Sequence, residues 1–156
     1  MSDAVTLMHR DHRVLTALLD RLAVPTSDRV ALVEELAARL TAHLRAGEQV
    51  YPMLTAPDHA DGVADASPPR LPRAGSAEDR LRILRATDPT SSQFDIALRE
   101  FTVAVTEQMR TESELLRDLA RRVGPETLRT AGTVFDARRA RELRVYGVED
   151  GPAPTG

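Results

Sequence analysis

The sequence predicts an all-α fold, specifically an up-down four-helix bundle with an additional C-terminal helix. Apolar residues recur at alternating steps of three and four along five segments, the spacing of one face of an α-helix. The connections between the first and second segments, and between the third and fourth, are short, which implies antiparallel neighbours. A chain of 156 residues, 42% of them hydrophobic, is long enough for one domain with a sizeable core.

The first two segments have the most regular pattern. The first is expected to begin after Ser2, a residue type that caps helices, and to end before Pro25. The second is expected to be capped by Thr26 or Ser27 and to end at Pro52, because proline lacks the N–H that a helix interior needs. Their stripes are Val5, Met8, His12, Leu15, Leu19 and Leu22, and then Val33, Leu36, Leu40, His43, Gly47, Val50 and Leu54.

The helical pattern stops after the second segment. Residues 55–75 are rich in proline, glycine, alanine and aspartate and show no periodicity, so they are predicted to form a loop. A short third helix is predicted over 76–86, and Asp88 followed by Pro89 ends it.

The fourth helix is predicted to be long. Ser91 or Ser92 is expected to cap it, and Gly124 followed by Pro125 breaks it. Its stripe consists of Leu98, Phe101, Val105, Gln108, Glu112, Leu115 and Leu119.

The last periodic segment, 126–146, has a weaker apolar pattern. We therefore expect the fifth helix to pack outside the bundle or across one end. Residues 1–148 then form a single domain, and residues 149–156, rich in glycine and proline, are predicted to form a disordered tail. The weak stripe consists of Leu128, Ala131, Val134, Phe135, Arg138 and Leu143.

Composition excludes several function classes. The absence of cysteine excludes disulfides, thiolate catalysis and cysteine-ligated metal centres. All 21 basic residues are arginine, so lysine chemistry is excluded as well. The net charge of −3 argues against a nucleic-acid partner, and no apolar run is long enough to span a membrane. The charged N-terminal segment is unlike a signal peptide, so a cytoplasmic location is expected.

Polar residues interrupt three of the apolar stripes. They are His12 in the first, His43 in the second, and Gln108 and Glu112 in the fourth. Histidine and glutamate bind iron, manganese and zinc, and residues four apart share a helix face. Facing helices that carry such residues predict a metal site inside the bundle. The alternative is a hydrogen-bonded polar network in the core that holds no metal.

Three stretches of the chain, 8–22, 40–54 and 101–119, resemble the hemerythrin-like (HHE cation-binding) family. The Asp11-His12 pair and the block AHLRAGEQVYP are the most specific part of the resemblance. It covers nearly the whole chain and implies a four-helix bundle with a non-haem di-iron centre. It also implies oxygen binding, iron handling, or oxygen, nitric oxide or redox sensing.

The ligand pattern of that family is only partly present. The family has one histidine on the first helix, His-x-x-x-Glu on the second, one histidine on the third and His-x-x-x-Glu on the fourth. His12 and His43 match the histidines of the first and second helices, and Glu112 matches the glutamate of the fourth.

Three ligand positions of the family are changed. Gly47 stands in place of the glutamate on the second helix, and Glu48 follows it, about 100° further round the helix. Asp79 aligns with the histidine of the third helix, and Gln108 with that of the fourth. The candidate metal ligands are therefore His12, His43, Glu112, Asp79, Glu48 and Gln108.

These residues leave three functions open. The first is an atypical non-haem iron-type protein, with one or two ions, that binds or senses a small ligand such as oxygen or nitric oxide, or a redox change. The second is a metal-free bundle that acts as an interaction or regulatory module with a protein partner not named by the sequence. The third is an oxygen-using iron enzyme in which Gly47 makes room for substrate.

Overall fold

The computed structural model describes residues 2–56 and 75–150, and over these residues it contains five α-helices and no strand. The predicted all-α class is therefore confirmed. Most of the predicted loop, and the chain beyond Asp150, lie outside the described residues. Of the predicted tail, Glu149 and Asp150 are described, and they contact Arg39 and Arg139. The helices are α1 (Ala4–Ala23), α2 (Arg29–Leu54), α3 (Gly75–Ala86), α4 (Ser92–Arg122) and α5 (Pro125–Val145).

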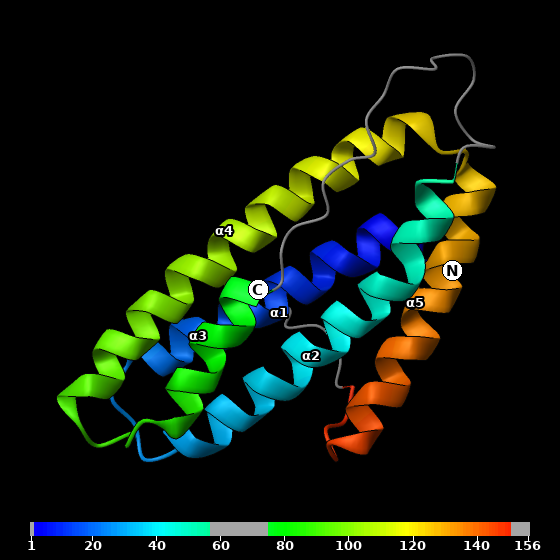
Figure 1. Cartoon of the computed structure of the whole chain (residues 1–156). Helices are drawn as coiled ribbons and strands as arrows, with labels where there is room; N and C mark the ends of the chain where they lie inside the picture. The colour runs from blue at the N-terminus through cyan, green and yellow to red at the C-terminus, as the bar shows by residue number, and fades with distance from the viewer. Residues whose placement is uncertain (1, 57–74, 151–156) are drawn as a thin grey trace.

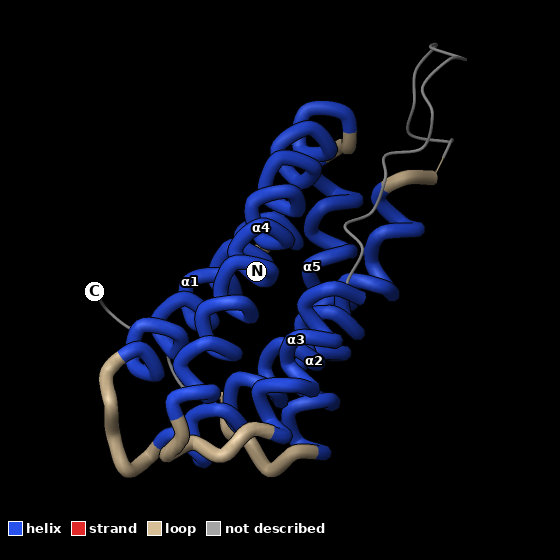
Figure 2. The backbone as a smooth tube through the Cα atoms, turned by 60° about the vertical axis from the view of Figure 1, so that its left-hand side comes forward, coloured by secondary structure: helices blue, strands red, loops and turns tan. Residues whose placement is uncertain are grey.

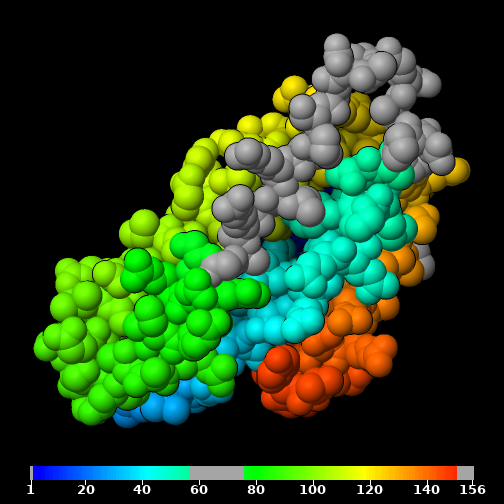
Figure 3. Space-filling model, in the orientation of Figure 1, coloured from blue at the N-terminus to red at the C-terminus, as the bar shows by residue number. Residues whose placement is uncertain are grey.

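Each helix runs in the opposite direction to the one before it (Figure 1). The short helix α3 packs against α4 and α2, and α5 packs along α2 and also contacts α1. The tube view in Figure 2 shows the helices side by side with their connections at the two ends. On the face seen in Figure 3, α2 lies between α3 and α5.

Helix α5 is an integral part of the bundle, so the expectation that it packs outside or across one end is wrong. Its Ala131 and Phe135 are fully buried. A Cβ atom at Gly132 would lie only 2.9 Å from the carbonyl carbon of Asp3 and 3.0 Å from the amide nitrogen of Ala4. Glycine thus allows α5 to approach the backbone at the start of α1. The apolar pattern is weak because this contact uses small residues.

Three predicted helix ends differ from those in the structure. The N-cap residue of α2 is Asp28, not Thr26 or Ser27, and its amide donates a hydrogen bond of 3.1 Å to Oγ1 of Thr26. Asp3, not Ser2, caps α1, and its Oδ1 accepts a hydrogen bond of 2.8 Å from the amide of Thr6. Pro52 lies inside the last turn of α2, which continues to Leu54. A proline this close to the end removes one helical hydrogen bond without stopping the helix.

Other predicted boundaries agree more closely with the structure. The third helix ends at Ala86, before Pro89, and α4 ends at Arg122, just before Gly124. Ser91 is the N-cap residue of α4, although its side chain makes no capping hydrogen bond.

The buried core consists of two apolar clusters. The first includes Leu36 and Phe101 together with the inward face of α3. The second includes Met8 and Phe135 and lies between α1, α2, α4 and α5. Burial of these aliphatic and aromatic side chains is the main force that holds the five helices together.

A polar layer separates the two clusters. On α1, His12 lies between Met8 of the second cluster and Leu15 of the first. His43 on α2 and Glu112 on α4 lie in the same way between apolar residues of the two clusters. The antiparallel helices therefore bring the polar residues of three separate stripes to one level of the bundle.

None of the helices in the described part of the chain is both long enough and apolar enough to cross a membrane.

Candidate metal centre

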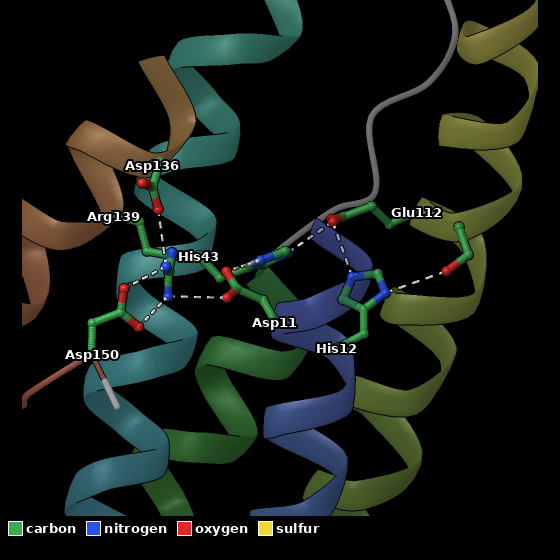
Figure 4. Close-up of polar contacts among 8 residues, drawn as sticks. Asp11, His12, His43, Glu112, Asp136, Arg139 and Asp150 are labelled. Atoms are coloured by element: carbon green, nitrogen blue, oxygen red, sulfur yellow. Dashed lines mark hydrogen bonds and ion pairs between the residues drawn. The ribbon is translucent and has the colours of Figure 1, made fainter. Parts of the chain in front are cut away.

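His12, His43 and Glu112 converge inside the bundle from α1, α2 and α4 (Figure 4). Their exposed fractions are 9%, 3% and 4%. One carboxylate oxygen, Oε1 of Glu112, lies 3.1 Å from Nε2 of His12 and 2.7 Å from Nε2 of His43. One ligand atom from each residue lies within 4.8 Å of the other two, so a single ion could contact all three.

The second ring nitrogen of each histidine has a partner of its own. Nδ1 of His43 lies 3.1 Å from Oδ2 of Asp11, and Nδ1 of His12 lies 3.3 Å from Oγ of Ser113. These contacts orient both rings with Nε2 toward Glu112 (Figure 4). Metal-binding histidines in proteins are commonly held in this way, by a carboxylate or other polar group on the far nitrogen.

The charges of the group balance one another without an ion. Burial alone would lower the pKa of His43, but the charge of Glu112 and hydrogen bonds to Asp11 and Glu112 outweigh it and raise that pKa to about 10. Burial alone would raise the pKa of Glu112, but His43, with hydrogen bonds from both histidines, holds it well below its ordinary range. His43 is therefore an imidazolium between two carboxylates in the metal-free protein.

Arg139 of α5 extends the polar group beyond Asp11. Its guanidinium is buried and lies 3.3 Å from Oδ1 of Asp11. It also contacts Asp136 at 3.1 Å and both carboxylate oxygens of Asp150, at 2.9 and 2.6 Å (Figure 4). The negative charge of Asp11 is thus balanced from two sides, by His43 and by Arg139.

The arginine of α5 that is buried is Arg139, not Arg138 as the sequence pattern predicted. Arg138, which was expected on the apolar stripe, forms an ion pair of 2.7 Å with Glu142 and is partly exposed. The stripe that is buried instead has a four-residue spacing through Phe135, Arg139 and Leu143. That spacing is visible in the sequence, but a charged residue on it was not expected to be buried.

An aromatic ring lies beside Gly47, the position at which the resemblance would place a glutamate. A Cβ atom at Gly47 would lie 3.2 Å from Cε2 of Tyr51, one turn further along α2. Tyr51 is itself buried, and burial, together with the negative charge of Glu112, raises the pKa of its hydroxyl. The ring of Tyr51 therefore lies near the end of α2 and beside the candidate centre.

Two candidate ligands lie outside the group. Asp79 is exposed on α3 and forms an ion pair of 3.2 Å with Arg82. It faces solvent because the apolar residues of α3 occupy the inward face. Glu48 is also exposed, since it lies about 100° from the buried Gly47 on a regular helix.

Gln108, the last of the six candidate ligands, lies on α4. It is buried one turn before Glu112 on α4. Its Oε1 has no hydrogen-bond partner among the described residues. An unpaired buried carbonyl is costly, and a ligand or water would relieve that cost.

Comparison with protein-family models, curated proteins and solved structures finds no match to this chain. The class of the protein therefore follows from the fold and the site together. It is an all-helical protein with a buried group of two histidines and one carboxylate.

Proposed function

We propose that this chain is a hemerythrin-like helical bundle that binds one metal ion of the non-haem iron type through His12, His43 and Glu112. Its role is to bind or sense a small ligand such as oxygen or nitric oxide, or a redox change. The observation that carries the proposal is the approach of both Nε2 atoms to the same oxygen of Glu112.

The donor set fits such an ion. Two histidines and one carboxylate form the ligand set of many mononuclear non-haem iron sites, which leave coordination positions open for a small ligand. Gln108 lies one turn before Glu112 on the buried face of α4, and its Oε1 has no hydrogen-bond partner among the described residues. Bound iron would supply reversible ligand binding and one-electron chemistry, while the chain holds the ligands in a water-poor layer between two apolar clusters.

The ligand count supports one ion. A pair of ions needs bridging carboxylates and about twice as many ligands. Glu48 and Asp79, the carboxylates that would add to the set, are exposed outside the group. Gly47 offers no side chain, and the ring of Tyr51 lies beside it.

The metal-free interaction module remains the second candidate, because the polar group is also satisfied without an ion. The imidazolium of His43 donates to Asp11 and Glu112, and the pKa of His43 is raised to about 10. A metal would have to displace the proton on Nε2 of His43. The two candidates therefore differ in whether a metal or a proton occupies the space between the histidines and Glu112.

The oxygen-using enzyme has less support. It was based on space for substrate at Gly47. The ring of Tyr51 lies beside that glycine, 3.2 Å from where a Cβ atom would be, so it occupies part of the space that the missing side chain would leave.

The test is the metal content of the full chain purified from iron-supplemented culture. We expect about one ion per chain, and a loss of most of it in His43→Ala and Glu112→Gln. Glu48→Gln and Asp79→Asn are matched controls, because each removes an exposed carboxylate that the sequence also suggested as a ligand. Both controls should keep the metal content of the parent protein.

Two results would overturn the proposal. Less than about one-tenth of an ion per chain, after attempted reconstitution with Fe(II) under anaerobic conditions, favours the metal-free module. Equal losses in Glu112→Gln and Glu48→Gln would place the metal elsewhere.

A further inference from the structure

We propose that Arg139 and Asp150 are positioning residues of the metal centre, and that the segment after α5 is part of its support. They act on His43 through Asp11. The inference rests on the proposed function where it is tested by metal affinity. Its second test, a chemical shift of His43 in the metal-free protein, does not depend on that function.

The first step is the return of the chain after α5. Gly147 has a positive φ of 67°, and the amide of Val148 donates to the carbonyl of Leu143. This left-handed residue turns the chain back along the helix. The carbonyl of Glu149 then accepts a hydrogen bond of 3.1 Å from Arg39 of α2. The segment is therefore attached to α2 as well as to α5.

The second step is the pairing of Asp150 with Arg139. Both carboxylate oxygens of Asp150 contact the guanidinium, at 2.9 and 2.6 Å. Paired contacts of this kind fix the plane of the guanidinium more strongly than a single contact does. The side chain of Arg139 is only 5% exposed, so solvent competes little with the pair.

The third step links Arg139 to the ligand. Nη1 of Arg139, which donates to Oδ1 of Asp150, also lies 3.3 Å from Oδ1 of Asp11. The other oxygen of Asp11 lies 3.1 Å from Nδ1 of His43. Asp11 is therefore held at both oxygens, and its orientation determines where the ring of His43 points (Figure 4).

Asp136 provides an internal comparison. It also contacts Arg139, at 3.1 Å, but through one oxygen and from an exposed position one turn earlier on the same helix. Loss of Asp136 leaves the paired contact with Asp150 in place. Loss of Asp150 leaves Arg139 with Asp11 and an exposed partner, so the guanidinium can turn toward solvent and release Asp11.

The experiment compares Asp150→Asn and Arg139→Gln with Asp136→Asn in the full chain. Co(II) serves as the probe, and its affinity is measured by competition with a chelator. We expect Asp150→Asn and Arg139→Gln to weaken Co(II) binding about tenfold, the low end of the effect of losing a partner of a ligating histidine. Asp136→Asn should change it less than about twofold. Asp150→Glu should restore most of the affinity, because it keeps the carboxylate.

A second readout uses the chelator-treated protein at one pH. The ¹⁵N chemical shift of Nδ1 of His43 should change in Asp150→Asn and Arg139→Gln and stay at the parent value in Asp136→Asn. If neither the parent protein nor any variant binds Co(II), but the chemical shift changes as expected, the proposed function fails and the positioning role stands. An unchanged shift in Asp150→Asn, or equal effects of Asp150→Asn and Asp136→Asn, would overturn the inference.

Discussion

The side chain of His43 has a polar partner at each of its two ring nitrogens. Its Nδ1 faces Asp11 and its Nε2 faces Glu112, and both partners are buried carboxylates. A buried imidazolium is costly unless it is paired in this way. The sequence placed His43 on an apolar stripe, but only the structure supplies the two partners that set its charge.

The charge of His43 makes the stability of the metal-free protein depend on pH. Its pKa is about 10 in the folded chain and 6.5 as the ordinary value, so its contribution is full below pH 6.5 and is lost as pH rises through 10. The pKa of Glu112 is lowered from 4.5, so its contribution is full above pH 4.5 and is lost as pH falls. Metal-free stability should therefore be highest between these two ordinary values.

Urea unfolding of the chelator-treated protein at pH 6 and pH 9.5 measures this effect. We expect the free energy of unfolding to fall by several kcal/mol, at roughly 1.4 kcal/mol per unit of pKa difference. His43→Gln cannot be protonated, so its stability should change much less between the same two pH values. Equal changes in the two proteins would show that His43 does not carry the charge.

At the scale of the helix, α2 combines a glycine and an aromatic residue one turn apart beside the centre. Tyr51 packs where a side chain at Gly47 would begin, and both residues are buried. A glutamate at this position would need the ring to shift, because a Cβ atom at Gly47 would lie 3.2 Å from Cε2 of Tyr51.

We expect Gly47→Glu alone to lower stability without raising the metal content, because the new side chain and the ring of Tyr51 compete for the same space. In a Tyr51→Ala background the same glutamate has room, so Gly47→Glu should raise the metal content there. A double-mutant cycle on thermal unfolding should give a coupling of at least about 0.5 kcal/mol between the two positions. Additive effects would mean that the ring moves aside freely.

The sequence predicted helix α5 correctly but not its position in the bundle. The helical spacing and the Gly124-Pro125 start predicted it closely. Its packing along α2 and α1 was not predictable, because Gly132 meets the backbone at the start of α1 and Arg139 is buried, and neither residue adds to an apolar stripe. The partners that make Arg139 buried come from α1 and from the segment after α5.

At the scale of the whole molecule, two apolar clusters enclose one polar layer. Each cluster draws residues from several helices, so the bundle does not need an ion to hold it together. This differs from small metal domains, in which the metal supplies most of the folding energy.

Metal removal should therefore leave the helices intact. We expect the far-ultraviolet circular dichroism of the chelator-treated protein to match that of the metal-bound form. Added metal at about one hundred times its dissociation constant should raise stability by roughly 2.7 kcal/mol, measured as a higher melting temperature. A loss of helical signal on chelation would contradict the view that the apolar clusters alone maintain the fold.

The sequence by itself determined the all-α class, the approximate helix limits and the polar residues on three stripes, because helical spacing and helix-ending residues act over a few positions along the chain. Only the tertiary structure decided that His12, His43 and Glu112 meet, that Asp79 and Glu48 do not join them, and that Asp11 and Arg139 support the group. These outcomes depend on how the helices are rotated and aligned against one another. Contacts between residues far apart in sequence set that alignment, and no local pattern records it.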